Sequence, residues 1–164
     1  MINPHQFVGL ILEPALKATD TYSLDAVYQV ARTLVMESKL THLKQLPEGP
    51  GLGFGQIEWA TYLDCCRYLK EVNHRLREDI LRYTERQYLP ETPVNLMGDL
   101  SLNVLMCRVK YYMIHEPIPS YKDVMSQANY YKKYYNTSEG AATLEMFERS
   151  SADLQGWINH GNES

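Results

Sequence analysis

Two acidic side chains on either side of a glycine-rich stretch carry the clearest acid–base chemistry in this 164-residue chain. Glu37 ends an amphipathic segment, and glycines at positions 49, 51, 53 and 55 then lead into Gln56 and Glu58. Glycine loses more backbone entropy on folding than any other residue, so glycines at this density indicate a backbone that turns sharply or passes very close to another group. The stretch therefore predicts a cleft, with Glu37 on one wall and Gln56 and Glu58 on the other.

The position of Glu37 on its segment favours a general acid. The apolar residues before it recur at three- and four-residue spacing, as on one buried helix face: Leu24, Val27, Tyr28, Ala31, Leu34 and Val35. At about 100° per residue, Glu37 falls beside Val30 and Leu34, at the margin of that face. Partial desolvation there raises a carboxyl pKa and keeps the proton available. The alternative is a solvated glutamate near a helix end.

The same residues resemble a known active-site signature. Glu37-Ser38, a loop, and then Gly-Leu-Gly-Phe-Gly-Gln-Ile-Glu at 51–58, followed by Ala-Thr, are similar to the lysozyme-like superfamily, especially its lytic transglycosylase and goose-type lysozyme branches. Gln45-Leu46 and Tyr-Tyr-Asn-Thr-x-x-Gly-Ala-Ala-Thr at 134–143 resemble small lysozyme-like proteins encoded by bacteriophages. The resemblance covers residues 32–147. Two positions depart from it: Trp59 stands where the family often has proline, and Tyr62 where the phage relatives have histidine.

The resemblance implies cleavage of peptidoglycan between N-acetylmuramic acid and N-acetylglucosamine, with Glu37 as the general acid. Glu58 is the first candidate for a second carboxylate, with Glu48 and Asp64 behind it. Its alternative role is an exposed residue whose charge favours the start of a helix. In lytic transglycosylases one glutamate acts as acid and then as base while the 6-hydroxyl of muramic acid attacks. The sequence leaves hydrolysis and transglycosylation open.

The remaining site residues are expectations that follow from the resemblance. Ser38 supports Glu37 or contacts substrate. Gln56 hydrogen-bonds the sugar or the backbone across the cleft, or else holds the glycine loop together. Tyr135 and Asn136 correspond to a Tyr-Asn pair that lytic transglycosylases place in their cleft. The alternative for the neighbouring Tyr130, Tyr131 and Tyr134 is a role in packing alone. The residues expected to shape the loop are Gly51, Gly53, Gly55 and Thr61. The sequence has no metal-ligand spacing, and we expect no metal and no cofactor.

Composition narrows the class of protein. The length and the 45% hydrophobic content predict one globular domain over residues 1–158, with a fraying tail over 159–164. The net charge of −4 argues against sequence-independent nucleic-acid binding. Cys65, Cys66 and Cys107 read as buried reduced thiols. The sequence lacks an apolar run of about eighteen residues, so we expect no membrane span.

The expected location of the protein follows from the predicted cleavage of peptidoglycan. The N-terminus lacks a signal-peptide pattern. A wall-cutting enzyme without one would act from a phage virion, or at the host cell wall after lysis or with a holin. The expected partners are bacterial peptidoglycan and other virion proteins.

The elements that position these residues are mainly helical. Asn3-Pro4 predicts a first helix to about Leu12, which Pro14 ends or kinks, and Ser23 predicts the start of the second. A small hairpin between Leu40 and Ile57 is the only β element that the pattern leaves open. The expected fold is thus a mainly α, lysozyme-like domain.

The second half of the chain also has a helical pattern. From Trp59 to Leu89 we expect helices broken at Asn73-His74, with one buried face made by Ala60, Leu63, Cys66 and Leu69. Residues 100–114 are apolar almost all round, which predicts a central buried helix. Ser120 and Asp123 resemble a capping box that opens a helix to about Tyr135, followed by a loop over 136–140. Thr143 is expected to cap a short helix to about Ser150.

Two other readings compete with an enzyme. One is a virion or assembly protein that keeps the lysozyme-like fold without turnover. The other is a peptidoglycan-binding module, whose binding would survive the loss of Glu37. The sequence has no histidine–carboxylate or Cys–His arrangement that would support a metallohydrolase or a cysteine protease.

Overall fold

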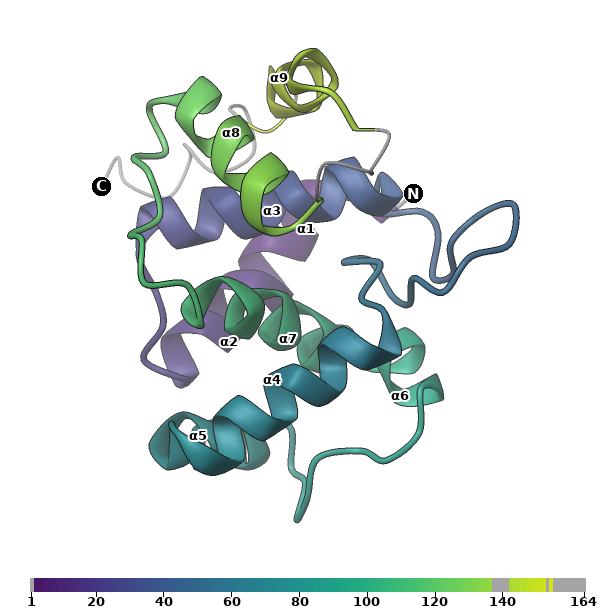
Figure 1. The fold of residues 1–164 in the computed structure, drawn as a ribbon, viewed down its shortest axis with the longest axis vertical. Helices are drawn as coiled ribbons and strands as arrows, with labels where there is room; N and C mark the ends of the chain where they lie inside the picture. The colour runs from purple at the N-terminus through teal and green to yellow at the C-terminus, as the bar shows by residue number, and fades with distance from the viewer. Residues whose placement is uncertain (1, 137–141, 153, 155–164) are drawn as a thin grey trace.

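The computed structural model describes residues 2–136, 142–152 and 154, and these fold into a mainly helical molecule (Figure 1). No strand occurs among the residues so described. The expected loop over 136–140 lies outside them after Asn136, as does the tail expected to fray. The helices are α1 (Pro4–Phe7), the π-helical turn η1 (Val8–Leu12), α2 (Glu13–Ala18), α3 (Leu24–Ser38), α4 (Trp59–Glu71), α5 (His74–Tyr83), α6 (Val94–Gly98), α7 (Leu100–Tyr112), α8 (Val124–Tyr134) and α9 (Leu144–Ala152).

The N-terminal helix starts as predicted but does not stop at Leu12. Asn3 caps α1, its Oδ1 accepting from the Gln6 N–H at 3.1 Å. The chain then widens into η1, where the N–H of Glu13 bonds the carbonyl of Val8, and continues as α2. Pro14 has no N–H and cannot join an ordinary α-helical ladder in mid-helix. The π-helical turn directly before it places Pro14 in the first turn of α2, where the missing donor costs little.

Helix α3 carries the predicted buried face and ends at the candidate acid. Ser23 caps it, with Oγ accepting from the Ala26 N–H at 3.0 Å. Lys39 ends it in the left-handed conformation (φ 53°), and its N–H still bonds the carbonyl of Val35 at 2.9 Å. The chain therefore turns away from the helix axis two residues after Glu37.

Helix α7 is the central helix, as the sequence predicted. Most of its side chains are buried, and it packs against α2, α3, α4 and η1. In Figure 1 it lies between α3 and α4. Asp99 caps it through an Oδ1 bond to the Leu102 N–H at 2.9 Å and pairs with Arg86 at 3.0 Å. The helix therefore has residues that can face both α3 and the glycine loop.

The helices over the second half are broken where expected, but one buried face was predicted wrongly. Asn73 caps α5, with Oδ1 accepting from the Leu76 N–H at 3.0 Å. On α4 the buried residues are Tyr62, Cys65 and Leu69, whereas Leu63 is 46% exposed. The face is displaced because Tyr62 packs inward despite its hydroxyl.

The two C-terminal helices enclose the far side of α3. Asp123 alone caps α8, its Oδ1 accepting from the Ser126 N–H at 2.9 Å, so the helix starts three residues later than a capping box at Ser120 would give. Thr143 caps α9 as predicted, with Oγ1 accepting from the Met146 N–H at 3.2 Å. Helices α8 and α9 pack on each other, and both pack on α3.

Between α3 and α4 the chain forms an irregular loop, without the small hairpin that the sequence left open. Its β pairing is limited to two isolated antiparallel bridges, Lys44 with Leu52 and Leu52 with Ile57. Leu52 and Ile57 exchange both backbone bonds, at 3.1 and 3.0 Å, around a turn over 53–56. The glycines permit this tight turn but leave no length for strands.

Among the helices that the structure describes, none is long and apolar enough to cross a membrane.

Candidate active site

Glu37 lies half-buried on the last turn of α3, with its carboxyl against α8. The Tyr131 hydroxyl donates to Glu37 Oε1 at 2.7 Å. Burial raises the pKa of Glu37 above its ordinary value, while the hydrogen bond from Tyr131, the charge of Lys110 and the Asn136 side chain act in the opposite direction. Burial has the largest effect, so Glu37 keeps its proton to higher pH than a solvated glutamate.

The positive charge of Lys110 acts on this carboxyl and lowers its pKa against the effect of burial. Lys110 projects from α7, and its Nζ donates to the Tyr135 carbonyl at 3.1 Å and lies 3.8 Å from the centre of the Tyr135 ring. Burial lowers the pKa of Lys110, and the negative charge of Glu37 raises it in compensation. The sequence reading missed Lys110. Its only signal was that it is one of two cations, with Arg108, in a stretch that is otherwise mostly apolar.

The glycine loop is fixed to α7 by one side chain, Asn103. Its Nδ2 donates to the Leu52 carbonyl at 3.1 Å, and its Oδ1 accepts from the Gly55 N–H at 2.8 Å. Gly53 has a φ of 68°, and a Cβ there would lie 2.1 Å from Asn103 Nδ2 and 2.3 Å from the Leu96 carbonyl oxygen. The loop can approach α7 this closely only because position 53 has no side chain.

Tyr135 connects the glycine loop to α8. Its hydroxyl donates to the Gly55 carbonyl at 2.6 Å, and its ring is almost wholly buried. A Cβ at Gly55 would lie 2.9 Å from that hydroxyl. Since Tyr131 binds Glu37 and Tyr135 binds Gly55, the end of α8 holds both walls of the predicted cleft.

Gln56 is held within its own loop. It has a left-handed backbone (φ 46°), and its Nε2 donates to the Gly53 carbonyl at 2.7 Å and the His42 carbonyl at 3.3 Å. Its Oε1 has no hydrogen-bond partner among the described residues. The donor end of the amide thus stabilises the loop, and the acceptor end is buried.

The other predicted residues divide between support and surface. Ser38 is buried, with its hydroxyl donating to the Leu34 carbonyl at 3.0 Å and accepting from the Leu40 N–H at 3.2 Å, so it helps to end α3. Asn136 accepts from Lys132 Nζ at 3.2 Å and acts on Glu37 through its side chain. Glu58 is exposed directly before α4, and Thr61 is half-buried within it.

Gly51 makes backbone bonds with the early part of the loop. Its carbonyl accepts from the Gln45 N–H at 3.0 Å, and its N–H donates to Gln45 Oε1 at 3.1 Å. The resemblance singled out both residues, and the structure places them together. Tyr131, which the sequence left as a packing residue, donates a hydrogen bond to Glu37.

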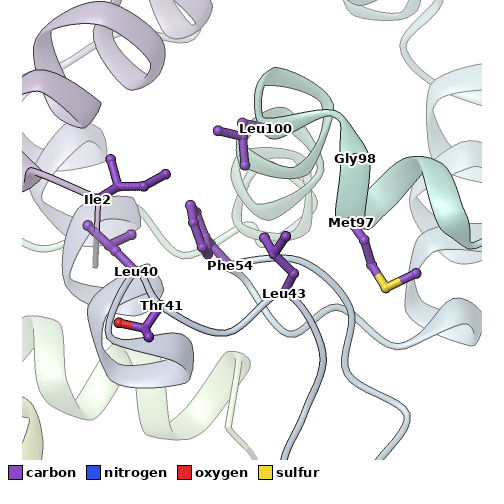
Figure 2. Close-up of a pocket in the computed structure, with 8 residues that line it drawn as sticks. All are labelled: Ile2, Leu40, Thr41, Leu43, Phe54, Met97, Gly98 and Leu100. Carbon is purple, nitrogen blue, oxygen red and sulfur yellow. The ribbon is translucent and has the colours of Figure 1, made fainter.

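A separate pocket of about 470 Å³ opens beside the loop (Figure 2). It is lined by Ile2, Leu40, Thr41, Leu43, Phe54, Met97, Gly98 and Leu100. Phe54 comes from the glycine turn and lies among Ile2, Leu40 and Leu43. The lining has no carboxylate, so this pocket offers apolar contact and no acid–base chemistry.

The thiols and acidic groups of the described residues do not form a metal site. Within the described ranges, no three histidine, cysteine, aspartate or glutamate side chains come together in a way that could hold a metal ion. All three cysteines are free, and burial raises the pKa of Cys65 and of Cys107 to about 12. These two thiols are therefore neutral near pH 7.

Comparison of the chain with models of known protein families, with curated proteins and with solved structures finds no match. Its function has to be inferred from the site itself.

Proposed function

We propose that this protein is a lysozyme-like enzyme that cleaves the glycan strand of bacterial peptidoglycan, between N-acetylmuramic acid and N-acetylglucosamine. One observation carries the proposal: Glu37 is a half-buried carboxyl whose pKa is raised by burial and which accepts a hydrogen bond from Tyr131 on α8. The end of α8 also binds the glycine loop, through Tyr135. A glycosidase needs such a protonated carboxyl to donate to the leaving oxygen. The motif resemblance supplies the substrate class.

In the proposed reaction Glu37 acts first as an acid and then as a base. Its proton passes to the glycosidic oxygen as the C1–O bond breaks, and the bonding electron pair leaves with that oxygen. The Glu37 carboxylate then takes a proton from the attacking hydroxyl as the new C1–O bond forms. Attack by water gives hydrolysis, and attack by the 6-hydroxyl of muramic acid gives the 1,6-anhydro product of a lytic transglycosylase.

Glu58 is the candidate second carboxylate, and its exposure allows either role. A base or nucleophile would need to approach the sugar from the face opposite Glu37. If Glu58 has no such role, one glutamate suffices, as in a transglycosylase. Replacing Glu58 with glutamine therefore separates a two-carboxylate from a one-carboxylate mechanism.

The test is product mass spectrometry on purified peptidoglycan. Wild-type protein should release muropeptides, and Glu37→Gln should lower the rate by about 10²- to 10⁴-fold, as is typical for loss of a general acid. Glu71→Gln, at the exposed end of α4, is the matched control and should keep wild-type activity. A product lighter by one water identifies a transglycosylase rather than a hydrolase.

The opposite outcome would favour one of the two rival roles. If folded wild-type protein releases nothing from several wall types, the enzymatic proposal fails. Sedimentation with insoluble peptidoglycan, unchanged in Glu37→Gln, would then favour a binding module. Absence of both activities would favour a virion or assembly protein. The proposed setting is a phage virion, or the host cell during release, with action at the cell wall.

A further inference from the structure

Trp59 is a half-buried tryptophan at the first position of α4, directly after the glycine loop and Glu58. One face of its indole stacks on the ring of Tyr62, with the ring centres 4.7 Å apart and the planes inclined by 21°. Among the described residues, no second ring and no cation lies against Trp59. The exposed part of the indole therefore lies on the side away from Tyr62.

The ring beneath Trp59 is fixed. Tyr62 has no exposed surface, and its hydroxyl donates to the Pro90 carbonyl at 2.7 Å. Stacked aromatic rings prefer a narrow range of offsets, so a fixed tyrosine also fixes the orientation of the indole above it. Trp59 is thus a flat surface that is oriented before any ligand arrives and loses little conformational entropy on binding.

The indole of Trp59 also keeps a polar group free. Its Nε1–H is a donor only, and it has no hydrogen-bond partner among the residues that the structure describes. A flat apolar face with one donor at its edge suits a ligand that is apolar on its face and polar at its rim. A pyranose ring is such a ligand: its C–H bonds meet the negative face of the aromatic ring, and its hydroxyl and acetamide groups accept hydrogen bonds.

We propose that Trp59 is a stacking platform for one sugar ring of the glycan strand, with the indole N–H donating to a hydroxyl or acetamide oxygen of that sugar. This inference deepens the proposed function and rests on it for the identity of the strand. Trp59 is a binding residue in this proposal, and the proton transfer stays with Glu37.

The platform continues one wall of the proposed cleft. Ile57 exchanges two backbone bonds with Leu52, and the Tyr62 N–H donates to the Glu58 carbonyl at 3.0 Å, so the chain passes directly from the glycine turn into α4 (Figure 1). A linear strand that lies between the two walls must run on beyond them. A platform at the end of one wall can therefore bind a sugar other than the two at the cleaved bond.

The same position is a departure from the lysozyme-like signature, in which proline is frequent. Proline has no aromatic face and no N–H, so it could not supply either contact. We therefore infer that this sugar contact belongs to the present chain and does not follow from the signature.

The first test follows Trp59 fluorescence in a Trp157→Phe background, which leaves Trp59 as the only tryptophan of the chain. The probe is a β-1,4-linked hexamer of N-acetylglucosamine, which has the flat strand and the acetamide groups of the glycan but no peptide. Its addition should shift the emission to shorter wavelength and saturate, because the sugar replaces water on the exposed indole. An α-1,4-linked glucose hexamer is the control ligand and should leave the emission unchanged. Emission that does not respond to the N-acetylglucosamine hexamer overturns the proposal.

Substitutions test the same contact by calorimetry. Trp59→Ala should weaken binding of the hexamer about tenfold, the order of magnitude of one aromatic contact. Trp59→Phe, which keeps a flat ring and loses the N–H, should fall between Trp59→Ala and the wild type. Tyr22→Ala removes another exposed aromatic side chain, next to the start of α3 and at the opposite end of that helix from Glu37, and is the matched control. Circular dichroism establishes that each variant is folded. Wild-type affinity in both Trp59 variants would contradict the platform.

Kinetics on peptidoglycan separate this inference from the proposed function. Trp59→Phe and Trp59→Ala should raise KM and leave kcat nearly unchanged, as expected for the loss of a contact that is equally strong before and during the reaction. An active enzyme whose KM is the same in these variants contradicts the platform and leaves the proposed function in place. Protein that binds the hexamer through Trp59 but releases no muropeptides contradicts the proposed function and leaves the glycan platform established.

Discussion

At the scale of single residues, ionisation of the half-buried Glu37 lowers the free energy of unfolding above acidic pH. Its native pKa lies above that of a glutamate in an unfolded chain, so between those two values the native state binds the extra proton. Stability consequently falls as the pH rises through that window. Below the unfolded pKa of about 4.3, both states hold the proton and the effect disappears.

Glu37→Gln should therefore stabilise the protein at neutral and higher pH. Glutamine copies the protonated carboxyl and cannot ionise, so the gain is about 1.4 kcal/mol for each unit by which the native pKa is raised. Urea unfolding at pH 4, 6 and 8 checks this, and the difference from wild type should grow with pH. If the free energies of unfolding of the two proteins changed with pH in the same way, the folded protein would not raise the pKa of Glu37.

Prediction at the level of residues succeeded where a local sequence pattern was sufficient. It failed where the interacting residue is distant in the sequence. Helical spacing was enough to place Glu37 at the edge of a buried face. It could not indicate that Tyr131 points at Glu37, because nothing in the local sequence fixes how α8 docks on α3. Lys110 was missed because a lysine near a helix end is ordinarily solvated, and its contacts with Tyr135 arise only when the segment after α8 docks on α7.

At the scale of elements, the glycine loop depends on one close approach to α7. Gly53→Ala combines a positive φ with a Cβ that would overlap both Asn103 and the Leu96 carbonyl. Adding a side chain where neither the backbone nor the space permits it should cost about 2–4 kcal/mol. Urea unfolding measures the loss, and any activity should fall with the displaced loop.

The matched control is Gly9→Ala, in the π-helical turn η1. A Cβ at Gly9 meets nothing within 4 Å, so alanine should be neutral or stabilise by up to about 1 kcal/mol through the unfolded state. Equal effects at positions 9 and 53 would show that the glycine turn is not pressed against Asn103.

Element boundaries show what sequence patterns leave out. The caps at Asn3, Ser23 and Thr143 could be predicted from the sequence, because a capping side chain acts within three residues. The buried face of α4 was not, since the Tyr62 hydroxyl reaches the Pro90 carbonyl at 2.7 Å and its ring stacks on Trp59 at 4.7 Å. Only the later loop makes an inward tyrosine acceptable there.

At the scale of the whole molecule, a buried polar network joins α3 to α8 and to the segment before α8. Arg32 on α3 is fully buried and donates to Gln127 Oε1 at 2.6 Å and to the Tyr121 carbonyl at 3.0 Å. Gln127 Nε2 in turn donates to the carbonyls of Asp25 and Pro119 at 3.1 and 2.8 Å. One glutamine thereby fastens α3, α8 and the segment before α8.

Gln127→Leu should destabilise the whole domain by about 3 kcal/mol, because it removes the three side-chain bonds of Gln127 and leaves the buried Arg32 with one of its two acceptors, the Tyr121 carbonyl. Asn129→Ala, two residues along α8 and exposed, is the control and should change little. Urea unfolding should be followed by far-ultraviolet circular dichroism and by Trp59 fluorescence, in a background where Trp157 is replaced by phenylalanine.

The two signals should coincide in both variants. A single apolar core runs from Phe7 in α1 to Leu154 and includes α4, so loosening the junction of α3 and α8 must also loosen the distant α4, where Trp59 stacks on Tyr62. Coincident signals are what a single cooperative domain predicts, and the continuous core supports the one domain that was expected from the chain length. If Trp59 unfolded at a different urea concentration from the backbone signal, α4 and the glycine loop would form a unit of their own. The walls of the proposed cleft would then belong to two bodies, and the tie from Tyr135 to Gly55 would be the contact that holds them together.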